Sequence, residues 1–226
     1  MRTRRVLVPV SIVVLSTITA ALAAPSKTTT PLTTEGVRVR EASGADLVAD
    51  AVLRASGARI VLLTAVQFRS EAAPPKTTTI PAGKVTSADV AGLLIKPEAT
   101  WVVSKITGEG LKAALERSLS RVPEESAHFL QVAGLKVEYD PQASSGHRVK
   151  SVTVGTEPIR DGTRYEVAMP EDLAKGGSGY FVIADFNENN IVPDRSGTLA
   201  TAVSSFLDAT PELKYAKSDR LVPKEQ

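Results

Sequence analysis

Cysteine is missing from this sequence of 226 residues, and histidine occurs only twice. Without cysteine the chain can form no disulfide and carry no lipid anchor on a cysteine side chain. The histidines stand in "SAHFLQ" (His128) and "SGHRVK" (His147), and neither has another histidine or an aspartate at a spacing typical of metal ligands. We therefore expect no metal site, no cofactor and no dinuclear phosphatase centre, and we interpret both histidines as structural or surface residues.

Aromatic residues and net charge are also low, with one Trp, four Tyr, five Phe and a formal net charge of +2. Nucleic-acid-binding domains normally carry a strong excess of Lys and Arg, so this class of partner is excluded. Long apolar runs are missing after residue 23, since no later run approaches the roughly 18 residues that a transmembrane helix needs. We therefore expect no membrane association once the N-terminal segment is removed.

Residues 1–23 have the features of a secretory signal peptide. "MRTRR" is a basic start, "VLVPVSIVVLSTITAALA" is uncharged and apolar, and Ala21-Leu22-Ala23 fits the A-x-A cleavage pattern. Cleavage after residue 23 would leave 203 of the 226 residues, and the loss of three arginines would change the net charge from +2 to −1. We predict an exported protein, periplasmic or extracellular, with a single domain.

Composition divides the remaining chain into three parts. Residues 24–36 ("APSKTTTPLTTEG") are rich in Thr and Pro and show no periodicity, which predicts a flexible, exposed leader. Residues 37–215 carry the regular patterns of one domain. Residues 216–226, which end in "LVPKEQ", are predicted to form a polar tail.

The first half of the domain alternates between predicted strands and helices. Strands are predicted at 37–41, 59–66 and 100–106, and helices at 45–57, at 86–94 and after a capping Thr107. From residue 129 onward the pattern is β-rich, with predicted strands at 129–140, 147–155 and 163–170 before a final helix at 198–210. The fold class is therefore α+β, α/β-like in its first half and β-rich in its second.

The motif "EDLAKGGSGY" (171–180) could be a serine nucleophile elbow, a phosphate loop or a turn. The elbow pattern G-x-S-x-G fails because Tyr180 stands where its last glycine belongs, and both histidines precede Ser178. The phosphate loop fails because no Gly-Lys-Ser/Thr follows and "YFVIADF" is strand-like. We interpret the glycines as serving backbone geometry, and we expect no catalytic residue in this chain.

Two arginines remain as candidates for binding an anion. Arg40 ends the first predicted strand, and Arg69 follows the strand at 59–66, an end of a strand where ligand crevices of α/β sheets tend to lie. A guanidinium offers paired donors to a phosphate or carboxylate. From spacing alone, a solvated surface position or a structural ion pair is the more common explanation for both residues.

Taken in order, several segments resemble the C-terminal domain of the secreted 5′-nucleotidase family. They are "REASGADLVADAVL", "IVLLTAVQFR", "AGKVTSADV", "TWVVSKITGEGLKAALE", "FLQVAGLKVEYDP", "HRVKSVTV" and "LAKGGSGY". The resemblance covers about residues 40–182 and implies that family's fold. It also implies a nucleotide-binding domain whose hydrolytic partner, a metallophosphoesterase domain with two metal ions, is a separate unit that nothing in this sequence resembles.

The resemblance implies binding roles for particular positions. Arg40 and Arg69 match family arginines that hold the phosphate–ribose end of the substrate. The polar Asn-x-Gly-Gly loop of the family is here Thr64, Ala65, Val66 and Gln67.

The family's base-stacking and polar positions have changed as well. One aromatic ring falls near Pro97, with the neighbouring asparagine replaced by Ala99, and the other ring falls on Asp172. The aspartate that contacts a ligand hydroxyl is Ser178. Losing two stacking rings and two polar contacts would weaken nucleotide binding by roughly 5–10 kcal/mol.

Two functions fit these residues. The first is an exported, non-catalytic module with a degraded nucleotide pocket, which binds an anionic small molecule such as a nucleotide or sugar phosphate through Arg40 and Arg69, or binds a protein. The second is the substrate-binding subunit of a nucleotide or phosphoester hydrolase whose metallophosphoesterase domain is a separate chain.

Overall fold

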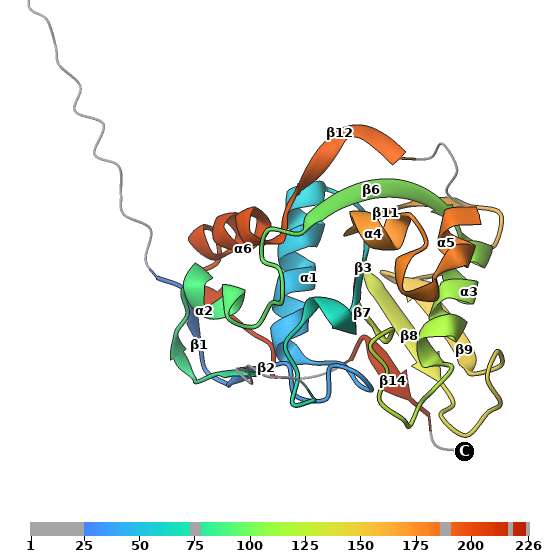
Figure 1. Ribbon diagram of the computed structural model, residues 1–226, viewed down its shortest axis with the longest axis horizontal. Coiled ribbons are helices and arrows are strands. Elements are labelled where there is room, and N and C mark those ends of the chain that lie inside the picture. The colour runs from blue at the N-terminus through green and yellow to red at the C-terminus, as the bar shows by residue number, and fades with distance from the viewer. Residues whose placement is uncertain (1–24, 73–77, 186–190, 217–218, 225–226) are drawn as a thin grey trace, which may run out of the picture.

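The computed structural model describes residues 25–72, 78–185, 191–216 and 219–224. The signal peptide predicted over 1–23 lies outside these residues. The secondary structure is a mixture of helices and sheets, as the α+β class requires (Figure 1).

A five-stranded sheet forms the centre of the fold, in the order β12-β6-β11-β3-β7. Its strands are β12 (Ile191–Thr198), β6 (Thr100–Thr107), β11 (Arg164–Pro170), β3 (Ile60–Thr64) and β7 (Leu130–Ala133). Of the strand pairs described in this sheet, only β11–β3 is parallel. All five residues of β3 are buried, which confirms the prediction that the apolar, β-branched run at 59–66 contains a strand covered on both faces.

The four predicted helices are present, although α2 ends at Ala91, three residues before the predicted end at 94. They are α1 (Ser43–Ser56), α2 (Ser87–Ala91), α3 (Gly108–Leu119) and α6 (Leu199–Asp208). Gly57 ends α1 in the left-handed conformation, with φ of 61°. Thr107 caps α3 by accepting a hydrogen bond from the backbone N–H of Gly110 at 3.2 Å. In Figure 1, α1 packs with α6 at the left and α3 with α5 (Phe181–Asp185) at the right, with strands between them.

A second sheet of four strands has the order β10-β9-β8-β14. It comprises β8 (Leu135–Tyr139), β9 (Val149–Val154), β10 (Glu157–Pro158) and β14 (Leu221–Pro223). β14 runs parallel to β8 (Figure 1). The prediction of a polar tail is therefore wrong for residues 219–224, because the backbone of this segment completes a sheet and Leu221 is buried.

The prediction of a flexible, exposed leader is wrong for residues 25–36. β1 (Lys27–Thr28) lies between β13 (Glu212–Leu213) and β5 (Gly83–Lys84), and β2 (Leu32–Thr33) pairs with β4 (Thr79–Ile80). Ser26 is buried, and its hydroxyl bonds to the carbonyl oxygens of Leu207 and Thr210. Residues far along the chain pair with the backbone and hydroxyl groups of this segment, and its composition alone does not reveal these hydrogen bonds.

Two further local predictions are wrong. Residues 37–41 form no strand; 37–40 lie in a turn and a bend, in which the N–H groups of Val39 and Arg40 both donate to Gly36 O at 2.9 Å. Phe181–Asp185 is the helix α5 rather than a strand. A helix does follow "GGSG", so one of the two arguments against a phosphate loop fails. The phosphate loop is still excluded because no Gly-Lys-Ser/Thr follows the glycines.

Candidate functional site

The structure places Arg40 and Arg69 on either side of one turn. The hydroxyl of Thr34 donates to Arg69 O at 2.8 Å, and the turn leads through Gly36 to Arg40. Gly36 has φ of 70°, and a Cβ there would collide with the guanidinium of Arg40. The Arg40 guanidinium also lies 3.6 Å from the Glu35 carboxylate, and both side chains are about 60% exposed. Arg40 therefore reaches solvent but already neighbours one carboxylate.

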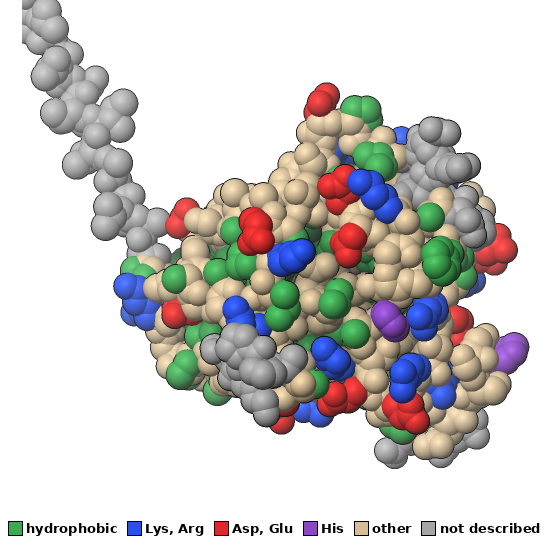
Figure 2. Space-filling view, in the orientation of Figure 1, with side chains coloured by type: hydrophobic (Ala, Val, Ile, Leu, Met, Phe, Trp, Pro, Cys, Tyr) green, Lys and Arg blue, Asp and Glu red, His purple; other side chains and the backbone are tan. Residues whose placement is uncertain are grey.

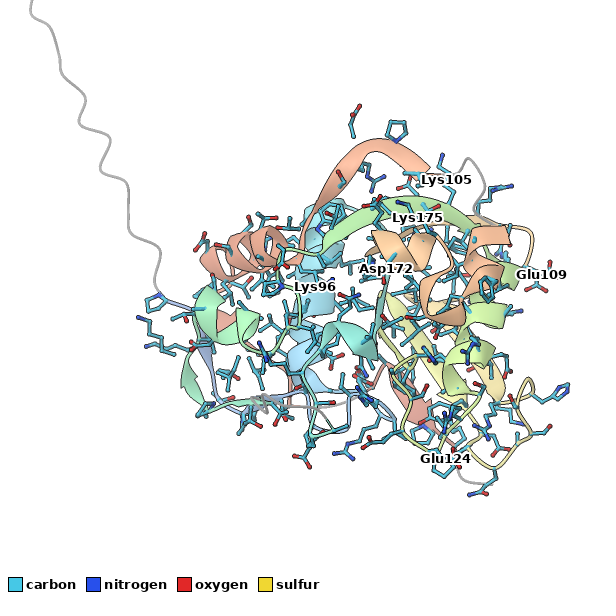
Figure 3. All side chains as sticks on the ribbon, in the orientation of Figure 1. Lys96, Lys105, Glu109, Glu124, Asp172 and Lys175 are labelled. Atoms are coloured by element: carbon cyan, nitrogen blue, oxygen red, sulfur yellow. The ribbon has the colours of Figure 1, made fainter. Side chains whose placement is uncertain are left out.

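Asp172 and Ser178 belong to a second group of residues around "EDLAKGGSGY". Asp172 is exposed on α4 (Glu171–Ala174), where Figure 3 shows it with Lys175 of the same segment. Ser178 is half-buried in the 3-10 turn η2 (Gly177–Gly179) and adopts a positive φ of 60°.

The glycines of this motif serve backbone geometry. Gly176 and Gly179 have φ of 83° and 76°, which glycine adopts without strain. A Cβ at Gly177 would lie 2.6 Å from the carbonyl oxygen of Asp172. The motif is a tight turn whose shape excludes side chains, in agreement with its interpretation from sequence.

Tyr180 fixes this turn to the core. Its ring is fully buried, and its hydroxyl donates to the carbonyl oxygen of His128 at 2.5 Å. Burial raises the pKa of the Tyr180 phenol well above its ordinary value, so the hydroxyl remains a donor at physiological pH. The Arg117 guanidinium lies 6.0 Å from the ring centroid, and its Nε donates to Gly179 O at 3.4 Å. The turn is therefore held over the C-terminal end of α3.

The backbone at Ala127 and His128 contacts both the turn after β3 and the turn at 176–180, an arrangement that the sequence did not indicate. On one side, Ala127 O accepts from the N–H of Val66, in the turn η1 (Ala65–Gln67) after β3. On the other side, His128 O accepts from Tyr180. Burial, then the charges of Arg117 and Arg121, lower the pKa of His128. The residues next to His128 in the sequence give no sign of these contacts.

Apolar side chains occupy the region where the resemblance placed a polar loop. Val66 and Ile95 are 41% and 47% exposed, and the Ile95 N–H donates to Gln67 O at 2.8 Å. Figure 3 labels Lys96, which follows Ile95, and Asp172 on the face turned to the viewer. Figure 2 shows hydrophobic side chains in the middle of this face and charged ones around them. The surroundings carry both basic and acidic side chains, and the centre of the face is suited to apolar contact.

Pro97 and Ala99 lie at the edge of this face beside α6. Pro97 O accepts from the N–H of Ala200 at 2.8 Å, and Ala99 O accepts from the N–H of Leu199 at 3.1 Å. Their backbone oxygens therefore hold the first turn of α6. Among the residues that the structure describes, no group of three or more His, Asp or Glu side chains is placed to hold a metal ion.

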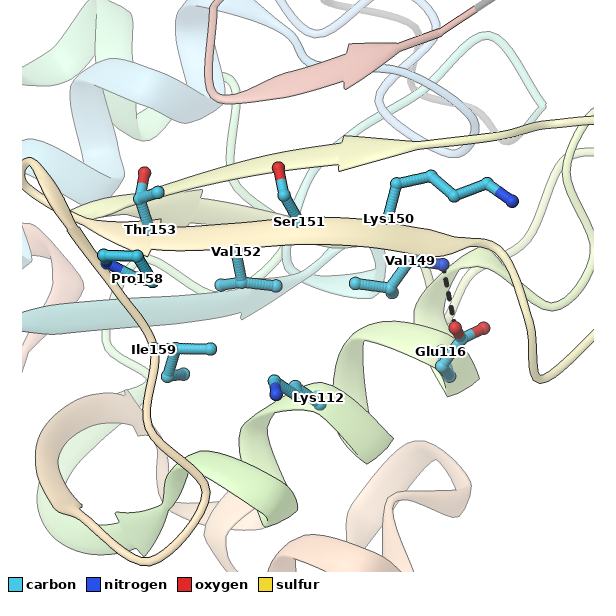
Figure 4. Close-up of a pocket in the computed structure, with 9 residues that line it drawn as sticks. All are labelled: Lys112, Glu116, Val149, Lys150, Ser151, Val152, Thr153, Pro158 and Ile159. Carbon is cyan, nitrogen blue, oxygen red and sulfur yellow. Dashed lines mark hydrogen bonds between the residues drawn. The ribbon is translucent and has the colours of Figure 1, made fainter. Parts of the chain in front are cut away.

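A groove lies elsewhere, between α3 and β9 (Figure 4). It has a volume of about 400 Å³ and an apolar floor that includes Val149, Val152 and Ile159. Two of its ionic side chains have structural partners. Glu116 accepts from the N–H of Val149 at 2.8 Å, and Lys112 pairs with an aspartate at 2.6 Å. The groove is lined by other residues than the predicted ligand positions.

Solved structures identify the class of this fold. The 5′-nucleotidase precursor from Thermus thermophilus is similar over 90% of this chain and 40% of its own, with a TM-score of 0.75 and 26% identity. The NAD nucleotidase of Haemophilus influenzae has the same fold, with a TM-score of 0.70 and 21% identity over 90% of this chain and 39% of its own.

Sequence comparison agrees with the fold. The family described as "5′-nucleotidase, C-terminal domain" matches residues 18–185. The Bos taurus 5′-nucleotidase is 30% identical over 130 residues, which are 54% of this chain and 22% of the relative. The trifunctional nucleotide phosphoesterase protein YfkN of Bacillus subtilis is 29% identical over 160 residues, 67% of this chain and 10% of the relative. The chain belongs to the 5′-nucleotidase C-terminal domain family.

The similar proteins are much longer than the matched region, since this chain spans 22% of the bovine enzyme and 10% of the Bacillus protein. In the described parts of the chain, every helix is too short or too polar to cross a membrane.

Proposed function

We propose that this chain is an exported, non-catalytic binding module built on the nucleotidase C-terminal fold. Its nucleotide pocket is degraded, and Arg40 and Arg69 provide its contacts to an anionic small molecule such as a nucleotide or sugar phosphate. The observation that carries this proposal is which residues occupy the positions that bind the ligand in the family. Asp172 and Ser178 stand where the resemblance places a ring and a carboxylate, and exposed Val66 stands where it places a polar loop.

The exchange of rings for Pro97 and Asp172 removes base stacking, which is worth about 1–3 kcal/mol per base. A module of this kind would therefore bind AMP little better than inorganic phosphate. Export is supported by the N-terminal sequence and by the names of similar proteins, which include the snake venom 5′-nucleotidase of Crotalus adamanteus.

The test is a thermal-shift screen of the mature chain with AMP, a sugar phosphate and inorganic phosphate, because a ligand that binds only the native state raises the Tm. We expect similar shifts for AMP and phosphate, and loss of both in Arg69→Ala. Arg54→Ala, which removes an exposed arginine from the end of α1, is the matched control. A much larger shift with AMP than with phosphate would contradict the degraded pocket.

Catalysis is tested on the same preparation. We expect no release of phosphate from nucleotides when Mg²⁺, Mn²⁺ or Zn²⁺ is added. Metal-dependent turnover by homogeneous protein would refute the non-catalytic role.

A second candidate function is the substrate-binding subunit of a phosphoester hydrolase whose metallophosphoesterase domain is a separate chain. It is favoured by the coverage of the Thermus structure, of which this chain accounts for 40%. It predicts that the chain co-purifies with such a protein and that Arg40→Ala or Arg69→Ala lowers their joint activity. Pull-downs that recover no metallophosphoesterase would exclude it.

A further inference from the structure

A pocket of about 300 Å³ lies where the β9–β10 hairpin meets the first residues of β3 and β11. Two of the residues that line it are arginines: Arg59 stands directly before β3, and Arg160 belongs to the loop before β11. Arg69, in contrast, follows the turn η1 after β3. The pocket therefore draws on the opposite end of β3 from the Arg40–Arg69 group.

The positive charges of Arg59 and Arg160 are not neutralised within the described part of the chain. Both residues are exposed, and neither guanidinium forms an ion pair or a side-chain hydrogen bond with another described residue. The acidic residues near them in sequence have other partners, since Asp161 lies 2.6 Å from a lysine of α3 and Glu166 lies 2.6 Å from an arginine of β12. All donors of the two guanidiniums are therefore available to a ligand.

The backbone of both arginines is fixed by close contact with a glycine. A Cβ at Gly134 would collide with Arg59 O, and a Cβ at Gly108 would collide with Arg160 O. The Arg59 N–H also donates to a carbonyl oxygen of β11 at 3.1 Å, and the Arg160 N–H donates to the hydroxyl of Tyr165 at 3.0 Å. Because both side chains extend from fixed backbone positions, an anion that binds them has only side chains to order.

The pocket also offers apolar surface beside these charges. Val154 and Tyr165 are buried residues of its lining, and Pro158 is an exposed one. Pro158 lines the groove of Figure 4 as well, where it stands at one end of β9. Apolar groups next to unpaired guanidiniums suit a ligand that has an anionic end and an apolar body.

One acidic residue, Glu157, lines the pocket and limits the charge that a ligand can carry. It is exposed, and it pairs with Val154 across the β9–β10 hairpin. Two guanidiniums and one carboxylate give the lining a formal charge of +1. A ligand with one negative charge neutralises this lining, whereas a divalent ligand leaves negative charge in excess beside Glu157.

We propose that this pocket binds a small organic carboxylate, whose charged group is held by Arg59 and Arg160 and whose apolar body lies on the Tyr165 side. A planar carboxylate matches the paired donors of a guanidinium. The volume of about 300 Å³ lies at the lower end for ligand pockets, so it suits one ring or a short chain better than a nucleotide. The site uses neither Arg40 nor Arg69, and it therefore does not depend on the function proposed above.

The experiment follows the backbone amide signals of the ¹⁵N-labelled mature chain by NMR at neutral pH and constant ionic strength. The probes are benzoate, the neutral benzamide, which has nearly the same shape, and sulfate, which is a divalent anion. We expect benzoate to cause saturable changes at the amides of Arg59, Arg160 and Tyr165. Benzamide should bind about tenfold more weakly or less, because it lacks the charge that the guanidiniums recognise. Sulfate should also bind more weakly than benzoate.

Variants test the role of each charge. Arg59→Gln and Arg160→Gln should each weaken benzoate binding about tenfold, and both should fold because the replaced side chains are exposed. Arg54→Gln, at the exposed end of α1, is the matched control and should bind benzoate like the wild type. Glu157→Gln raises the formal charge of the lining from +1 to +2 and should strengthen the binding of sulfate more than that of benzoate.

The same spectra show whether each variant is folded, so a lost ligand effect can be told from a lost fold. The proposal is overturned if benzoate causes no saturable change, if benzamide binds equally well, or if both Gln variants of the pocket arginines keep full affinity. Sulfate binding tighter than benzoate binding in the wild type would reveal a general anion patch and would overturn it also. Arg69→Ala should leave benzoate binding unchanged, and loss of binding in that variant would place the ligand in the Arg40–Arg69 group instead.

Discussion

The Arg220 Nη2 atom lies 2.8 Å from the Asp50 carboxylate, although the two residues are 170 positions apart. Asp50 lies on α1, whereas Arg220 directly precedes β14. The Arg220 Nε also lies 3.5 Å from Asp46, and Glu41 accepts from the backbone N–H groups of Arg220 and Leu221 at 2.8 Å each. This ionic cluster of Glu41, Asp46, Asp50 and Arg220 attaches the last described strand to the first helix.

The cluster should make stability depend on pH. Burial raises the pKa of Asp46 to about 8, with Glu41 and Asp50 adding to the rise and Arg220 opposing it. Folded Asp46 therefore keeps its proton up to about pH 8, whereas the unfolded side chain loses it near pH 4. Because the folded state binds more protons in this window, the free energy of unfolding should fall as pH rises from about 4 to about 8, by at most about 1.4 kcal/mol per pH unit.

The measurement is urea denaturation at several pH values between 5 and 8 for the wild type and for Asp46→Asn, which imitates the protonated side chain. The difference in unfolding free energy between the two proteins should change steadily with pH. Asp208→Asn, at the end of α6, is the control and should follow the wild type. Parallel curves for wild type and Asp46→Asn would refute a protonated Asp46.

Removing the side chain of Arg220, the basic member of the cluster, should strongly destabilise the protein. Arg220→Ala leaves the Asp50 carboxylate without its cation and also removes a 3.0 Å hydrogen bond to Val132 O. Breaking a buried ion pair on one side typically costs about 3–5 kcal/mol. Chemical denaturation should show a loss of this size.

The control for Arg220→Ala is Lys214→Ala, whose pair with Glu212 is 83% and 77% exposed. An exposed pair of this kind contributes little, so this variant should change stability by less than about 1 kcal/mol. Equal effects of the two variants would show that β14 is not anchored by the cluster.

The glycine turn allows a test with a matched glycine. In Gly177→Ala the new methyl group would lie 2.6 Å from Asp172 O, a backbone atom, so we expect a loss of about 1–3 kcal/mol in unfolding free energy. Gly162→Ala adds the same group where no described atom lies within 4 Å and should be nearly neutral. Thermal or urea denaturation distinguishes them. Similar stabilities would mean that this turn is not shaped by steric exclusion.

The contribution of residues 25–36 to stability can be tested by removing one hydroxyl group, that of Ser26. Ser26→Ala leaves the carbonyl oxygens of Leu207 and Thr210 without their shared donor, which should cost about 1–3 kcal/mol. The exposed Ser145 provides the control, since Ser145→Ala should have almost no effect. Denaturation curves that coincide for Ser26→Ala and wild type would indicate that residues 25–36 contribute nothing to the fold.

The sequence predicted the features that depend on short stretches of chain. The buried strand β3 followed from its unbroken apolar run, and the boundary of α3 followed from Thr107. The ordered set of motifs indicated the family. The interpretation of "GGSGY" as a turn also held, because positive φ values are a local property of glycine.

The candidate site was only partly predictable, because it depends on contacts between distant parts of the chain as well as on short stretches. Arg40 and Arg69 could be picked out by their positions at predicted strand ends, but the ion pair of Arg40 with Glu35 depends on how the turn at Gly36 folds. His128 escaped notice because its neighbours Arg117 and Tyr180 come from different elements. The sequence around residue 128 does not indicate which side chains from other segments lie next to it.

By itself, the sequence determined the α+β class, the positions of the four longer predicted helices and strand β3, and the family, since each follows from periodicity, capping residues or motif order. Only the tertiary structure decided that residues 25–36 and 219–224 are built into sheets and that Arg220 closes an ionic cluster on α1. Both segments are polar, and a polar segment is ordered only when distant atoms satisfy its hydrogen bonds and charges. Those partners are set by the three-dimensional arrangement of the chain.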